Sequence, residues 1–244
     1  MVVTTTPGQP DQRYRPAVAL VVATAPTPTA DVVLADGDDA RFAALTTRLR
    51  GYAARLAGAP AAPPHGVPVP YDREWPRAAT RRLGRLAAVF ARLDGVRPCS
   101  GQHIGATAVP GLAAIPVIDL QVQVADLPPA TLLDAVLAPL GFLTATGSRP
   151  DALGAEEAAK WRMRVFTGPD PELPTTLVVR QAASPFAGRT VDFRDWLRAN
   201  RAERDRYQNL KVTLARHPGE DPDRALHTYF ERVQPKIESW RRGG

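Results

Sequence analysis

The sequence predicts an α+β protein in which a small mixed sheet is flanked by helices. Residues 118–124 alternate strictly between apolar side chains and the polar series Asp, Gln, Gln, which is the period of a half-buried strand. Residues 160–166 and 175–182 alternate in the same way around a Gly-Pro-Asp-Pro segment, which indicates a hairpin. Helical spacing of apolar residues predicts covering helices in three segments: 83–93, 128–140 and 226–240.

The first part of the chain predicts a small strand–helix unit beside this main domain. Residues 1–15 are polar and are expected to be a disordered tail. An N-terminal appendage follows over 16–60, with short apolar strands near its start and an amphipathic helix at 40–57. Residues 61–70 are rich in Pro, Ala and Gly and form the expected linker, so the main domain is assigned to 71–244.

The segments around the predicted sheet have recognisable boundaries. Gly141 is the expected end of the helix at 128–140, and Asp221-Pro222 is a cap signal for the last helix. Residues 145–155 are expected to form an exposed loop. Two helices are expected between residue 193 and the start of the last helix. The apolar residues of the helix at 40–57 are expected to share one face: Phe42, Leu45, Leu49, Tyr52 and Leu56.

Composition excludes several classes of protein. The 244 residues include one cysteine, Cys99, which excludes an internal disulfide and a cysteine-based metal cluster. No apolar run reaches about 18 residues and the N-terminus lacks a signal-peptide pattern, so a cytoplasmic protein without a membrane span is expected. The net charge is +6, but the arginines alternate with acidic residues, which argues against a nucleic-acid partner.

The stretch His-Ile-Gly-Ala-Thr-Ala-Val-Pro-Gly-Leu-Ala-Ala-Ile-Pro-Val-Ile-Asp-Leu-Gln-Val, residues 103–122, resembles the signature of the GrpB family. The resemblance covers about 69–240 and implies the fold of the nucleotidyltransferase superfamily. It is strongest to the GrpB-like domain that follows dephospho-CoA kinase in actinobacteria. Residues 30–56 resemble the end of that kinase, although the chain has no Gly-x-x-x-x-Gly-Lys-Ser/Thr phosphate loop.

The resemblance implies a nucleotide site beside the strand at 118–124. Gly105, Ala106 and Thr107 would be the phosphate-binding turn, because glycine lets backbone N–H groups approach an anion. Asp119 would be the catalytic carboxylate and would hold Mg²⁺ weakly, together with a nucleotide. The second carboxylate of the superfamily is Gln121 here, whose side-chain amide is a candidate ligand contact. A structural turn, capped by Asp119, is the alternative interpretation.

Further candidates come from neighbouring segments. His103 is either a general base or a hydrogen-bonded structural residue. Arg162, Arg164 and Arg180 are candidate anion contacts, since the guanidinium fork suits phosphate, although solvated arginines would look the same in sequence.

Four polar positions of the family pattern are apolar in this chain: Ala106, Ile115, Val178 and Val233. Three hypotheses follow. The chain binds a nucleotide or phosphorylated ligand in a cleft with a degenerate catalytic site. Alternatively it is a non-catalytic scaffold or protein-interaction domain, with a protein partner or a second copy of itself. A third hypothesis is a repurposed transferase with a substrate other than a nucleoside triphosphate.

Overall fold

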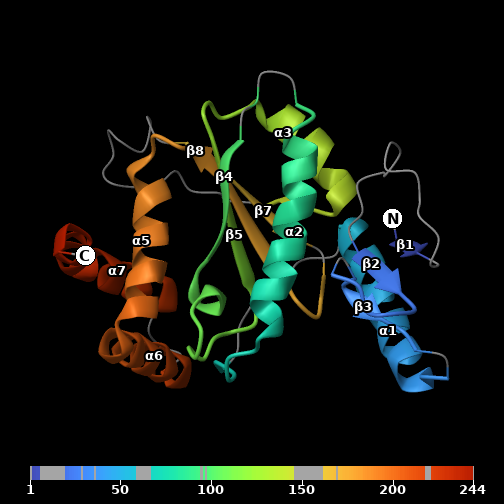
Figure 1. The fold of residues 1–244 in the computed structure, drawn as a ribbon, viewed down its shortest axis with the longest axis horizontal. Coiled ribbons are helices and arrows are strands. Elements are labelled where there is room, and N and C mark those ends of the chain that lie inside the picture. The colour runs from blue at the N-terminus through green and yellow to red at the C-terminus, as the bar shows by residue number, and fades with distance from the viewer. Residues whose placement is uncertain are drawn as a thin grey trace.

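The structure is a computed structural model with three layers, in which helices cover both faces of a five-stranded sheet (Figure 1). The residues that it describes are 2–5, 20–28, 30–35, 37–58, 67–93, 96, 98–145, 162–168, 170–217 and 221–243. Within these ranges, no helix combines the length and the apolar character that crossing a bilayer requires.

The sheet has the strand order β4-β5-β8-β7-β6. β5 is antiparallel to β4 and parallel to β8, while β7 is antiparallel to both β8 and β6. The hairpin of β7 and β8 and the strand β5 confirm the sequence predictions for these segments, whereas β4 and β6 were not predicted as strands. The strands are β4 Pro98–Ile104, β5 Ile118–Val124, β6 Leu143–Thr144, β7 Met163–Gly168 and β8 Thr175–Gln181.

The main hydrophobic core lies between the sheet and two helices, α2 Glu74–Phe90 and α3 Ala130–Leu137. The apolar residues of β5 all face this layer, and α2 supplies Leu86 and Phe90, both fully buried. Burial of such side chains stabilises a fold by about 1.5–3 kcal/mol each. Gly141 follows α3 in the left-handed region, at φ 85°, as its position in the sequence predicted.

The opposite face of the sheet is covered by α5 Pro185–Ala199, α6 Arg201–Arg216 and α7 Pro222–Gly243 (Figure 1). A second apolar cluster joins these helices to the loop that follows β4, with Val109 and Leu112 fully buried in it. α5 begins earlier than expected, because a proline at a first helical position favours initiation there.

The N-terminal appendage forms its own small unit beside α2 (Figure 1). Leu20, Val22 and Leu45 make a separate apolar cluster between its parallel sheet and its helix. Two expectations are corrected there. Val2–Thr5, placed in a disordered tail, forms a strand on β2, and Phe42 and Leu56 are exposed on the helix instead of sharing its packed face. The elements are β1 Val2–Thr5, β2 Leu20–Ala23, β3 Val32–Val33 and α1 Asp39–Leu56.

Two buried carboxylates join the appendage to the main domain. Asp31, after β2, pairs with two arginines of α2. Asp170, after β7, pairs with Arg48 of α1 and Arg82 of α2. The junction is therefore ionic, in contrast to the apolar cores on either side of it. Most of the expected linker and all but one residue of the loop expected at 145–155 lie outside the described residues, and the proposed domain boundaries stay predictions.

Removal of residues 1–60 is expected to leave a folded main domain of reduced stability. The main core contains no residue from the appendage, but the truncation leaves two arginines without Asp31 and Asp170 without Arg48. A loss of about 2 kcal/mol in the free energy of unfolding is expected from these unpaired groups. Urea unfolding followed by circular dichroism measures it. A truncated chain with no cooperative transition would show that the appendage belongs to the core.

Candidate functional site

The turn after β4 is built around a glycine that no other residue can replace without strain. Gly105 has φ 74°, in the left-handed region, and is followed by a short 3-10 helix, Ala106–Ala108. A Cβ atom at Gly105 would lie 2.2 Å from Oδ2 of Asp119. The glycine is required both by its backbone conformation and by the carboxylate that lies against it. The predicted turn and strand therefore meet at Gly105 and Asp119.

Asp119 lies on the face of β5 opposite the main core. It is half-buried, and burial raises the pKa of its carboxyl group from 3.8 to about 6. A hydrogen bond from Thr176 of β8 and the positive charge of Lys211 oppose this shift. Asp119 thus lies among polar groups from three elements. Its carboxyl group titrates close to neutral pH. A cavity of the described residues lies elsewhere, at the appendage junction.

α6 contributes two residues to this place that the sequence analysis did not assign to a site. Burial lowers the pKa of Lys211 to about 8, although Asp119 favours its charged form. Burial and the neighbouring Asp119 raise the pKa of Tyr207 well above its ordinary value. Lys211 also donates a hydrogen bond to the carbonyl oxygen of Ala113 at 3.3 Å, which anchors it beside the loop after β4.

The spacing of Tyr207 and Lys211, one helical turn apart, places both on one face of α6. This spacing, together with the similarity of this helix to the family's C-terminal pattern, was the signal in the sequence that could have identified the two residues. We call the residues Gly105, Asp119, Thr176, Tyr207 and Lys211 the Asp119 site.

His103 is not part of the Asp119 site. It pairs across the sheet with Leu120, a residue of the main core, so the two residues lie on the opposite face from Asp119. Thr107 donates its only hydroxyl proton to Val117 at 2.8 Å, so His103 Nε2 donates to the Thr107 oxygen at 3.0 Å. Burial, followed by the charges of nearby arginines, lowers the pKa of His103 to about 4. At neutral pH it is a neutral structural residue.

Gln121 is fully buried and bonded to α5. Its amide nitrogen donates to the carbonyl oxygen of Ala187 at 2.9 Å, and its oxygen accepts from the Thr190 hydroxyl at 2.9 Å. Ala106 is partly buried and packs against both apolar clusters of the main domain. Neither residue presents a polar group to a ligand, and Thr107 is buried as well.

The three predicted arginines do not converge on Asp119. Arg180 is buried and donates to the carbonyl oxygen of Phe186 at 3.1 Å, so its side chain supports the start of α5. Arg164 pairs with Val179, a residue of the main core, and lies on the face opposite Asp119. Arg162 is exposed before β7.

The Asp119 site fits a resident magnesium ion poorly. Mg²⁺ is usually held by one or two carboxylates together with substrate phosphates. Here the described residues supply one carboxylate, and the Lys211 ammonium group competes for it. Among the residues with defined coordinates, no three His, Cys, Asp or Glu side chains converge. The donor set suits an anion that pairs with Lys211 better than a metal ion of its own.

Replacement of Gly105 by alanine is expected to destabilise the chain more than the same change at Gly111. Both glycines have a φ near 75°, but a Cβ at Gly111 meets nothing within 4 Å. Gly111→Ala is expected to lose about 1 kcal/mol from backbone strain. Gly105→Ala adds a steric collision and should lose about 3 kcal/mol. Equal losses in urea unfolding would contradict the close contact with Asp119.

The raised pKa of Asp119 predicts a pH-dependent stability. The folded protein holds this proton more tightly than the unfolded chain, so Asp119 favours folding below pH 3.8 and loses this contribution as pH rises through about 6. The free energy of unfolding of wild type, minus that of Asp119→Asn, should fall between these pH values and stay level above them. Urea unfolding from pH 4 to 7.5 measures it. Asp126→Asn, at an exposed carboxylate just after the same strand, is the control and should give a flat difference.

Comparison with known proteins identifies relatives of this chain in sequence. The chain is 34% identical over 147 residues to a UPF0157 protein of Halalkalibacterium halodurans, covering 60% of this chain and 68% of that protein. It is 32% identical over 209 residues to a dephospho-CoA kinase of Mycobacterium tuberculosis, covering 80% of this chain and 48% of that protein. The chain thus spans about half the length of that kinase.

Similarity in structure and a family model agree with these relatives. The crystal structure of the conserved protein GrpB from Enterococcus faecalis superposes with a TM-score of 0.55 at 21% identity, covering 71% of this chain and 99% of that one. The GrpB protein family model matches residues 68–242, which include the turn at Gly105, Asp119 and the helix that carries Lys211. The chain belongs to the GrpB family.

Proposed function

We propose that this chain binds a nucleotide or another phosphorylated small molecule at the Asp119 site, without the full catalytic set of a nucleotidyltransferase. The observation that carries the proposal is the exposed Gly105, which lies against Asp119, a carboxylate that interacts with the charge of Lys211. A carboxylate and an ammonium group that are both partly desolvated cost stability, and such groups are typical of functional sites.

Each group of the Asp119 site has a separate part in binding. Lys211 provides a positive charge for a phosphate, and burial strengthens this attraction by lowering the local dielectric constant. Asp119 accepts a hydrogen bond from a ligand hydroxyl, and Thr176 orients its carboxylate. Tyr207 stays a neutral phenol that donates a hydrogen bond. Any magnesium ion would arrive with the phosphates of the ligand.

Nucleotidyl transfer itself is disfavoured by the placement of the remaining candidates. Two-metal chemistry needs a second acid beside Asp119, but Gln121 occupies that position and is bonded to α5. The predicted base, His103, lies on the other face of the sheet, where its imidazole bonds the Thr107 hydroxyl. Ligand binding therefore requires fewer residues at this site than nucleotidyl transfer does.

A scaffold role is the second candidate, and one observation favours it. Curated relatives named dephospho-CoA kinase match this chain over about half of their length. A domain that accompanies a kinase in one chain could serve its assembly or stability. Ligand binding at the Asp119 site separates the hypotheses, because a pure scaffold has no need of an intact Lys211.

The experiment is a calorimetric titration of the chain with nucleoside mono-, di- and triphosphates and with phosphorylated CoA precursors, each with and without Mg²⁺. Binding of one of these ligands is expected. Lys211→Gln should weaken it about tenfold, since a charged hydrogen bond is lost. Lys236→Gln is the matched control, because Lys236 is exposed on α7 and pairs with Glu203.

Mg²⁺ alone should give no appreciable heat, because one carboxylate beside an ammonium group holds it poorly. Asp119→Asn should weaken nucleotide binding chiefly when Mg²⁺ is present. Failure of every phosphorylated ligand to bind, or equal losses in Lys211→Gln and Lys236→Gln, would remove this proposal in favour of the scaffold.

A further inference from the structure

A cavity of about 330 Å³ lies at the junction of the appendage and the main domain, on the other side of the sheet from the Asp119 site. This volume falls within the range of small-molecule sites, roughly 300–1,000 Å³. Its wall combines arginines with carboxylates and the faces of apolar residues. Its lining includes Arg48, Asp72, Glu74, Trp75, Arg81 and Glu172.

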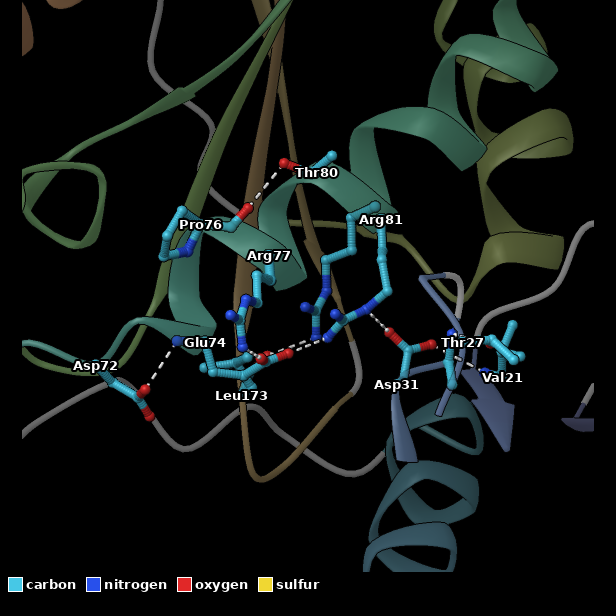
Figure 2. A network of polar contacts seen from close by, with 12 residues as sticks. Val21, Thr27, Asp31, Asp72, Glu74, Pro76, Arg77, Thr80, Arg81 and Leu173 are labelled. Atoms are coloured by element: carbon cyan, nitrogen blue, oxygen red, sulfur yellow. Dashed lines mark hydrogen bonds and ion pairs between the residues drawn. The ribbon is translucent and has the colours of Figure 1, made fainter. Parts of the chain in front are cut away.

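The first half of the cavity wall is built around Asp31, whose side chain is 4% exposed. Arg81 Nε lies 3.1 Å from one of its oxygens, and Arg85 pairs with the other. Arg81 also reaches Glu74, whose side chain is 44% exposed (Figure 2). The guanidinium group of Arg81 therefore contacts the buried carboxylate of Asp31 through Nε and the half-exposed carboxylate of Glu74 through Nη2.

The second half repeats this arrangement around Asp170, whose side chain is 2% exposed. Arg48 Nε lies 2.9 Å from Asp170, and Arg82 Nη2 lies 3.1 Å from it. Arg48 Nη1 pairs with Glu172 at 3.1 Å, and Glu172 is 51% exposed. Again one arginine joins a buried aspartate to a solvated glutamate at the rim.

The buried part of this network carries an excess of two positive charges, because four guanidinium groups surround two carboxylates. The rim glutamates Glu74 and Glu172 balance it from the solvent side, and the exposed Asp72, which accepts a hydrogen bond from the backbone N–H of Glu74, adds a third carboxylate to the lining. Both glutamates are about half-exposed, whereas the arginines that they contact are buried, so the glutamates are the replaceable partners.

We propose that the junction cavity binds a phosphate-bearing small molecule, which takes the places of Glu74 and Glu172 on Arg81 and Arg48. A phosphate monoester carries close to two negative charges at neutral pH, which matches the excess of the buried network. The arginine fork suits phosphate through paired hydrogen bonds. Because Arg48 belongs to α1 and Arg81 to α2, the ligand would join the appendage to the main domain.

The test is an NMR titration of the full chain with inorganic phosphate at constant ionic strength, followed at the indole N–H of Trp75. Trp75 lines the cavity, and Trp196, in the apolar cluster on the other face of the sheet, is the internal reference. Phosphate should shift Trp75 and leave Trp196 unchanged. Acetate, with one charge, should bind at least several times more weakly. A parallel titration with adenosine monophosphate separates an esterified phosphate from the inorganic ion.

Four variants decide where and how the ion binds. Glu74→Gln/Glu172→Gln removes the two competing anions and should tighten phosphate binding about threefold or more. Arg81→Gln should weaken it about tenfold, with Asp31 still paired to Arg85. Arg50→Gln, at an exposed position of α1 outside the cavity lining, is the matched control and should bind as wild type does. Lys211→Gln should also leave it unchanged, which separates this site from the Asp119 site.

Three results would overturn the proposal. One is the absence of a Trp75 shift in both wild type and the double glutamine variant. Another is a double variant that binds phosphate no more tightly than wild type, because the rim glutamates would then not be competitors. The third is equal weakening by Arg50→Gln and Arg81→Gln, which would indicate only general attraction to a basic surface. The double glutamine variant keeps the test decisive even if Arg81→Gln misfolds, since both glutamates lie at the rim.

Discussion

The alternation of side chains along β5 is the constraint on which the rest of the main domain depends. Leu120 and its apolar neighbours on this strand form the centre of the core with α2 and α3. The residues between them face α5 and α6, and their polar groups set how those helices sit: Gln121 bonds α5, while Asp119 lies close to two residues of α6. A shift of register by one residue would exchange these two environments completely.

The same alternation divides the family motif into structural and exposed parts. His103 and Thr107 close a chain of hydrogen bonds that ends at the carbonyl oxygen of Val117, so they shape the loop between β4 and β5. Gly105, between them in sequence, is exposed and lies against Asp119. Conventional interpretation of such a motif treats its polar residues as one site, whereas here they serve two faces of the sheet.

Sequence reasoning predicted what depends on local pattern. Strict alternation located β5, β7 and β8, and helical spacing located α2 and α3, because one buried face is enough to determine each period. β4 was missed because it lacks such alternation, with Gly101 and polar neighbours in place of a repeated apolar set. Phe42 and Leu56 were placed in a packed face of α1 because spacing cannot tell how wide the covered surface is. The pairing of distant charges, such as Arg48 with Asp170, has no local signal at all.

The site residues show the same limit more sharply. Asp119 and Gly105 were found because the motif brings them close in sequence, and β4–β5 pairing brings them into contact. Lys211 was overlooked because its relation to Asp119 is created only when α6 packs over the end of the sheet. Conversely, Arg180 and Gln121 were selected for their chemistry, but both are occupied in holding α5. Chemistry in a sequence identifies residues that can bind; only packing decides whether they bind a ligand or the protein itself.

Buried charged groups are a feature that the two proposed sites share. At the Asp119 site one carboxylate and one ammonium group are partly desolvated, and both pKa values move toward neutrality. At the junction each buried aspartate pairs with two arginines, so each such group has one more positive than negative charge. Pairs of this kind are rarely more stable than apolar packing of the same volume. Their presence on both sides of the main sheet is the common ground of the two proposals, because recognition of an anion would need charges that apolar packing cannot provide.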